Sequence, residues 1–226
     1  MEELSIIKLL GQGGWIMIVL AIMSIIAVYI FVERFMTIKN AGKDDPLFMA
    51  RIRDYIKNGD VSSAVNFCRI TNTPAARMIE RGISRMGRPV AEIQAAVENT
   101  GNIEVSLLEK RLPVLSTIAG GAPMVGFLGT VIGMVEAFWQ MSNAGSNIDI
   151  STLSGGIYQA MVTTVGGLVV GIAALFAYNY LVAKVDGVVR EMEQKTMSFM
   201  DIMNEYDKHS TILANTFLST VISHIC

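Results

Sequence analysis

Basic residues are missing from a long central stretch of this chain, from Leu112 to Ala183. Its 72 residues contain no Lys or Arg, and only Glu136 and Asp149 carry a charge. The stretch holds two apolar segments, each longer than the roughly 20 residues that a helix needs to cross a bilayer. Residues 143–147 (NAGSN) separate the two segments and are typical of a loop. We therefore expect a transmembrane helical hairpin.

Cysteine and histidine are scarce, with two of each among 226 residues. Cys68 and Cys226 have no metal-ligand spacing, and two isolated thiols do not make a disulfide framework. His209 and His224 lie near the C-terminus, so the apolar stretch contains no histidine that could activate a nucleophile. Phosphate-binding loops and the HExxH and GxSxG motifs are absent as well. These absences predict a protein that is not an enzyme and that binds no cofactor or metal.

Apolar residues make up 52% of the chain and charged residues 17%, and the mean hydropathy is +0.47. This composition is typical of a membrane protein. The first uncharged run, residues 15–32, ends at Glu33 and Arg34. A signal peptide would need a basic start and a small-residue cleavage site, whereas this start is acidic. We expect a retained transmembrane helix, and the net charge of −2 gives no indication of nucleic-acid binding.

Positive charge is concentrated in residues 34–111, which hold 13 of the 18 Lys and Arg. Acidic residues are interleaved with them, which favours a solvated helical surface over a lipid-binding or nucleic-acid-binding patch. Basic residues next to membrane-spanning segments stay on the cytoplasmic side. The loop at 142–152 has none. The pattern predicts that residues 34–111 and the C-terminus are cytoplasmic and that the N-terminus is outside.

The expected fold is all-α, with three transmembrane helices and long cytoplasmic helical extensions. Its segments are an outer N-terminus (1–14), transmembrane helix 1 (15–33), a cytoplasmic helical loop (34–111), transmembrane helix 2 (112–141), an outer loop (142–152), transmembrane helix 3 (153–183) and a cytoplasmic C-terminal helix and tail (184–226). Within the cytoplasmic loop, Asp60, Pro74 and Pro89 are helix-start signals, and Gly87 is a stop signal. From His209 the apolar residues recur at helical spacing, which predicts an amphipathic helix that packs on the extensions or lies on the membrane.

Glycines recur on one face of each helix of the expected hairpin. At about 100° per residue, Gly126, Gly129 and Gly133 fall within a stripe of about 60°. Ala160, Gly167 and Gly171 share a face of the next helix. Small residues let helix backbones approach closely in a membrane. We predict helix packing at six glycines: Gly126, Gly129, Gly133, Gly166, Gly167 and Gly171.

Polar residues next to these glycines are the candidates for transport chemistry. Thr130 lies beside the stripe of the second helix, and Thr164 lies on the small-residue face of the third. An isolated membrane Thr bonds back to its own helix carbonyl. Threonines in both members of a glycine-rich hairpin favour a polar track instead. The alternative is a membrane scaffold in which the glycines only pack helices.

Two segments of this hairpin together resemble the ExbB/TolQ family, whose relatives include the flagellar stator protein MotA. They are residues 123–134 (PMVGFLGTVIGM) and residues 155–168 (GGIYQAMVTTVGGL). The resemblance implies an energy-coupling subunit of the bacterial inner membrane. Copies would form a ring of five around the transmembrane helices of an ExbD/TolR-type partner. Proton flow would drive work on an outer-membrane transporter, through a TonB-like periplasm-spanning protein, or on another envelope machine in a TolQ-like or stator-like role.

The resemblance also implies roles for single residues. Thr130 and Thr164 match the pore-lining threonines of the family, and the titrating carboxylate is expected on the partner. Gln159 stands where some members carry a glutamate, and Glu136 lies outside the family motif. Together with Thr163, these two residues are candidates for polar pore or partner contacts.

Overall fold

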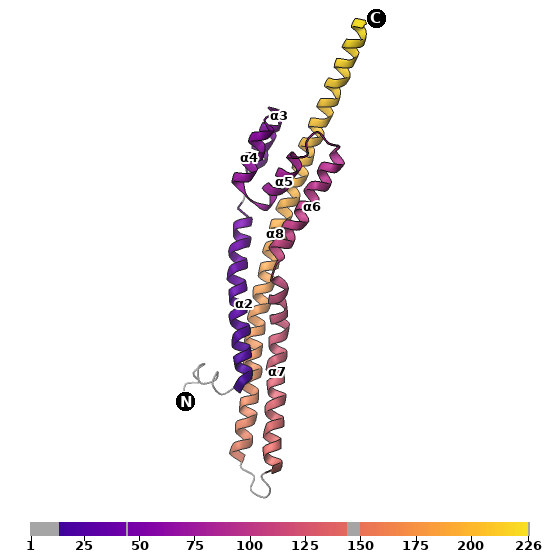
Figure 1. Cartoon of the computed structure of the whole chain (residues 1–226). Helices are drawn as coiled ribbons and strands as arrows, with labels where there is room; N and C mark the ends of the chain where they lie inside the picture. The colour runs from indigo at the N-terminus through magenta and orange to yellow at the C-terminus, as the bar shows by residue number, and fades with distance from the viewer. Residues whose placement is uncertain (1–13, 44, 144–149, 226) are drawn as a thin grey trace. The chain divides into compact units, whose positions relative to one another are not determined.

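The computed structural model describes residues 14–43, 45–143 and 150–225, and the side chains of these residues except at 150–152 and 209–225. The expected outer N-terminus up to residue 13, the loop at 144–149 and Cys226 lie outside the described residues. The helices are α2 (Gly14–Ala41), α3 (Phe48–Lys57), α4 (Val61–Thr71), α5 (Pro74–Ile83), α6 (Val90–Glu109), α7 (Leu112–Asn143) and α8 (Ile150–Ile225) (Figure 1). No strand occurs in the described part of the chain, so the all-α expectation is confirmed.

Three described segments are long and apolar enough to cross a membrane. They are Gly14–Ala41, Val90–Asn143 and Leu153–Lys208. Each contains one of the three transmembrane helices expected from the sequence. α8 has 76 residues and includes the segment after His209, for which we expected a short helix.

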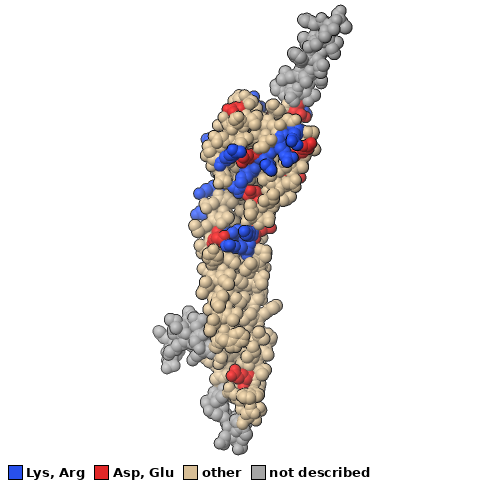
Figure 2. All heavy atoms as spheres, in the orientation of Figure 1, with Lys and Arg blue, Asp and Glu red and all other residues tan. Residues whose placement is uncertain are grey.

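The chain divides into two compact units. One, the apolar unit, comprises Met1–Phe35 and Glu109–Ala183, and the other, the polar unit, comprises Met36–Leu108 and Lys184–Cys226. On the face that Figure 2 shows, Lys, Arg, Asp and Glu gather on the polar unit and are almost absent from the three helices of the apolar unit. The helix α8 contributes its first part to the apolar unit and the remainder to the polar unit.

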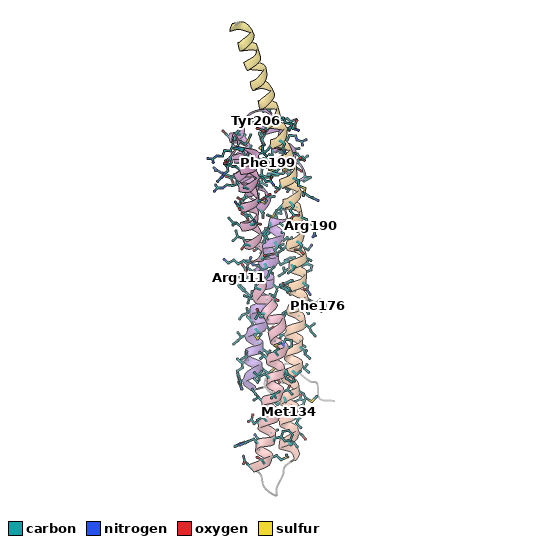
Figure 3. The ribbon with its side chains drawn as sticks, turned by 90° about the vertical axis from the view of Figure 1, so that its right-hand side faces the viewer. Arg111, Met134, Phe176, Arg190, Phe199 and Tyr206 are labelled. Carbon is teal, nitrogen blue, oxygen red and sulfur yellow. The ribbon has the colours of Figure 1, made fainter. Side chains whose placement is uncertain are left out.

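In the apolar unit, α2, α7 and the first part of α8 lie side by side (Figures 1 and 3). Ile16, Met17 and Leu20 on α2 form a buried cluster with Ala122 on α7. Many large apolar side chains point outward, among them Phe176, which is 72% exposed (Figure 3). An apolar surface of this extent indicates contact with lipid or with other protein helices.

The polar unit follows the start and stop signals of the sequence. The Asp60 carboxylate accepts a hydrogen bond from the backbone N–H of Ser63 at 3.0 Å and caps α4. Thr73 caps α5, with Pro74 at its first position. α5 ends at Ile83, before the predicted stop signal at Gly87, and the chain then turns and reaches Gly87 with φ +88°. Only glycine adopts that conformation without strain.

A buried ion pair ties α5 to α6 in the polar unit. The Arg77 guanidinium donates to both carboxylate oxygens of Glu104, at 2.6 and 2.5 Å. Glu104 is only 6% exposed, so this bidentate bond compensates the burial of its charge. Gly101, about one turn from Glu104, lies within the continuous helix α6, and the absence of a side chain there makes room for Met78, whose Cε atom lies 2.7 Å from the position of an added Cβ.

Candidate site at the hairpin of α7 and α8

The site begins with the close approach of two backbones. A Cβ added to Gly126 would lie 2.8 Å from the Thr163 carbonyl oxygen, and one added to Gly167 would lie 2.6 Å from the Ala122 carbonyl oxygen. Real Cβ atoms do not approach other atoms this closely, so only glycine fits at both positions. The two helices are therefore held in contact along their small-residue faces, as small residues allow in membranes.

Five of the six glycines predicted for helix packing lie at this contact. For Gly129 the obstructing group is the Thr163 side chain, for Gly133 it is Ala160, and for Gly171 it is Pro123. Gly166 instead faces α2, where the Met17 side chain lies 3.2 Å from the added Cβ. Gly156 was not among the predicted six, yet its added Cβ would lie 2.8 Å from that of Ala137.

Thr130 and Thr164 meet across this contact, and both are partly buried. The Thr130 hydroxyl lies 2.9 Å from the Ala160 carbonyl oxygen of α8. The Thr164 hydroxyl lies 3.2 Å from the Gly126 carbonyl oxygen of α7. The two hydroxyl oxygens are also in hydrogen-bonding contact with each other. An isolated threonine in a helix bonds back to a carbonyl of its own helix. Neither of these two hydroxyls does so.

Two hydroxyl protons serve these three contacts, so the pair has two complete arrangements. In one, Thr164 donates to Thr130 and Thr130 donates to the Ala160 carbonyl. In the other, Thr130 donates to Thr164 and Thr164 donates to the Gly126 carbonyl. Each hydroxyl has one donor and two acceptor positions, so the pair reverses its direction without breaking the helix contact. In either arrangement the hydroxyl oxygens keep an acceptor position for a neighbouring donor, and the pair donates to a neighbouring acceptor when one hydroxyl turns away from its backbone carbonyl.

Thr163 lies next to this pair and contacts the same two backbone carbonyls, but from the buried side of the helix contact. It is 2% exposed, and its hydroxyl lies 2.7 Å from the Ala160 carbonyl oxygen and 3.3 Å from that of Gly126. The side chain is therefore enclosed within its own chain. The role of Thr163 in polar pore or partner contacts, considered from the sequence, stays a prediction.

Glu136 and Gln159 do not join the threonine pair. Both are exposed on the surface of the apolar unit. The Gln159 side chain lies next to the start of α2, since a Cβ added to Gly14 would lie 2.8 Å from its Nε2 atom. The structure therefore brings Thr130 and Thr164 together and leaves the other two polar candidates at separate positions.

Sequence reasoning missed two features of this unit. The acceptors of the threonine hydroxyls are the backbone carbonyls of Gly126 and Ala160. Every residue has a backbone carbonyl, so the residue type does not reveal which one accepts. Arg111, at the start of α7, donates to the Glu33 carboxylate of α2 at 2.5 Å. Arg111 adopts φ +71°, an uncommon conformation for a residue other than glycine. No cluster of metal-ligating side chains occurs among the residues that the structure describes.

Comparison with known proteins agrees with the resemblance to the ExbB/TolQ family. The model of the MotA/TolQ/ExbB proton channel family matches residues 70–194, more than half of the chain, including α7 and the threonine pair. An ExbB homolog of the biopolymer transport type from Methanothermobacter thermautotrophicus is 25% identical over 190 residues, which cover 84% of this chain and 67% of that protein.

Two bacterial relatives match over shorter segments. The Tol-Pal system protein TolQ of Haemophilus influenzae is 36% identical over 100 residues, 44% of this chain and 42% of TolQ. The biopolymer transport protein ExbB of Helicobacter pylori strain J99 is 42% identical over 79 residues, 35% of this chain and 54% of that protein. This chain thus spans about half the length of these two relatives.

Proposed function

Because the chain belongs to the MotA/TolQ/ExbB proton channel family, we propose that it is an energy-coupling subunit of the bacterial inner membrane. It works with an ExbD/TolR-type partner and uses proton flow to drive mechanical work on envelope or outer-membrane transport machinery. Copies of the chain form a ring, expected to be a pentamer, around the transmembrane helices of the partner.

The threonine pair is the observation that carries this proposal. Thr130 and Thr164 contact each other between two glycine-packed apolar helices, and their protons can be arranged in two directions. A carboxylate needs hydrogen-bond donors, and a carboxylic acid needs an acceptor. The pair provides either without a change of charge on this chain.

Because this pair carries no charge of its own, we assign the titrating carboxylate to the partner. An ionisable side chain in hydrocarbon is costly and normally faces a cavity or another protein. A ring of hydroxyl pairs lowers the cost of a partner carboxylate in both protonation states. Moving one charge through 100 mV releases about 2.3 kcal/mol, so several protons supply enough free energy for a conformational step.

The charge pattern supports an orientation for the subunit. Thirteen of the 18 Lys and Arg fall in residues 34–111. Under the positive-inside rule this segment is cytoplasmic, the N-terminus and the loop after α7 are periplasmic, and the C-terminus is cytoplasmic. The protein is thus a multi-pass inner-membrane subunit.

Proton flux is the direct test. The chain is co-expressed with an ExbD/TolR-type protein from the same organism, purified and reconstituted into vesicles that contain a pH-sensitive dye. An imposed membrane potential should acidify the lumen of vesicles that contain both proteins. Vesicles with this chain alone, or with a partner whose membrane carboxylate is changed to the amide, should stay near the background rate.

Equal flux in all three preparations would show that the partner carboxylate is not the proton site. Background flux in all three, with an intact complex, would favour a membrane scaffold without transport.

A further inference from the structure

The polar unit contains a groove that no part of the described chain fills. It lies between α6 and α8, and its volume is about 720 Å³. Residues of α6 from Gln94 to Val105 form one wall, and residues of α8 from Val189 to Asp201 form the other. At about 1.5 Å per residue, the α6 wall is long enough to accept roughly three turns of a helix or a turn with long side chains.

Four methionines give the groove its apolar character. Met78 and Met192 are buried at 6% and 3% exposure and form the floor, whereas Met197 is 64% exposed at the rim. Met200 follows Met197 along α8 and is partly buried. Methionine is flexible and polarizable and is frequent at surfaces that bind protein partners. The exposed Met197 adds apolar surface that is available to a partner.

Three acidic residues line the same groove: Glu98, Glu193 and Asp201. Glu98 accepts a hydrogen bond from Gln94 at 2.8 Å, and no Lys or Arg lines the groove. Among the described residues, none of the three carboxylates forms an ion pair. The groove therefore favours a protein segment whose side chains are apolar along their length and positively charged at their ends.

Arginine side chains meet both requirements, because their methylene stems cover apolar surface while the guanidinium stays available for carboxylates. The chain itself presents such a pair at the end of α5. Arg81 and Arg85 are four residues apart, and neither forms an ion pair with another described residue. On the face that Figure 2 shows, basic side chains of the polar unit lie at the surface with acidic side chains among them.

We infer that the groove of one copy binds the Arg81–Arg85 segment of the next copy. The contact joins the end of α5 in one copy to the groove between α6 and α8 in the next copy, and a head-to-tail contact of this kind forms a ring when the rotation between copies closes. The inference rests on the proposed ring, and it identifies where neighbouring subunits contact each other outside the apolar unit.

Charge reversal tests this contact. The groove variant combines Glu193→Arg with Asp201→Arg, and the arginine variant combines Arg81→Glu with Arg85→Glu. Each should lower the assembled fraction in mild detergent at least fivefold, measured by native mass spectrometry. The chain with all four changes should recover assembly, since the complementary charges are restored. As a matched control for the groove variant, Asp54→Arg with Asp186→Arg makes the same charge change at exposed acids outside the groove and should assemble normally.

Cysteine cross-linking tests the same contact without altering the acids. One tagged chain carries Asn102→Cys, a second with a different tag carries Arg85→Cys, and both carry Cys226→Ser. Oxidation should produce a dimer that contains both tags, which only a contact between copies can give. Each cysteine chain alone should give at most a tenth of that product.

A normal ring without the two-tag dimer, and without loss of assembly in the groove variant, would overturn the inference and leave the proposed ring intact. A normal ring from which the groove variant loses the ExbD/TolR-type partner would assign the groove to that partner instead. Absence of any oligomer of the unmodified chain would overturn both the ring and this contact.

Discussion

Gly167 on α8 and Ala122 on α7 lie in backbone contact, such that a Cβ on Gly167 would stand 2.6 Å from the Ala122 carbonyl oxygen. A backbone atom cannot rotate away as a side chain can. Gly167→Ala should therefore push the two helices apart and disrupt the hydrogen bonds of Thr130 and Thr164. We expect a fall of 5 °C or more in the melting temperature in detergent, together with loss of proton-coupled activity.

Gly155→Ala is the matched control for this change, because no atom lies within 4 Å of the position of its added Cβ. It should leave the melting temperature and activity within error of the unmodified chain. Equal melting temperatures for Gly167→Ala and the unmodified chain would contradict the close helix contact.

Glu136 tests whether this chain supplies its own titrating group. The residue is exposed on α7 and lies outside the threonine pair. Glu136→Gln keeps the size and removes the charge, and we expect at least half of the flux of the unmodified complex in the vesicle assay. Loss of flux with normal assembly would move the proton site from the partner to this chain.

Cys68 affects how the orientation of the chain can be tested. Burial raises the pKa of its thiol to about 12, and the nearby Glu80 carboxylate acts in the same direction. Only the thiolate reacts with alkylating reagents, so Cys68 should resist labelling at pH 8 on either side of the membrane. Its lack of reaction is therefore no indicator of sidedness.

Exposed introduced cysteines avoid this problem. In the Cys226→Ser chain, Ser154→Cys should react with a membrane-impermeant maleimide on spheroplasts, and Ser62→Cys should react only after lysis. The opposite pattern would reverse the orientation derived from the basic residues. Denaturation should make Cys68 reactive in every sample, which confirms that burial protects it.

The sequence predicted the features that depend on neighbouring residues. Asp60 caps α4 and Pro74 opens α5 because capping and φ restriction act within one turn. The glycine stripe of α7 was also predictable, since helical periodicity alone brings Gly126, Gly129 and Gly133 to one face.

Features that depend on long-range packing were not predictable in the same way. The bond between Arg111 and Glu33 joins residues 78 positions apart. The groove residues Met192, Met197 and Met200 recur at helical spacing, which is equally typical of a buried core. The burial of Thr163 beside the partly buried Thr164 depends on how α8 is rotated against α7.

Thr130 and Thr164 give the most specific prediction of the proposed function. Thr→Val at both positions keeps the side-chain shape and removes both hydroxyls. A partner carboxylate would then lack a donor when charged and an acceptor when protonated, and proton flux should fall at least tenfold. The variant also loses the bonds to Ala160 and Gly126, which at about 0.6 kcal/mol each should lower hairpin stability modestly without preventing assembly.

Thr→Ser at both positions separates the chemistry from the packing, because serine keeps the hydroxyl and removes a methyl group. Flux should stay within about threefold of the unmodified complex. Melting temperature and ring mass are measured on the same preparations, so that a loss of flux is interpreted only where the ring persists. Full flux in an assembled Val variant would show that the two hydroxyls serve only to bind α7 to α8, because a proton path that needs them cannot survive their removal.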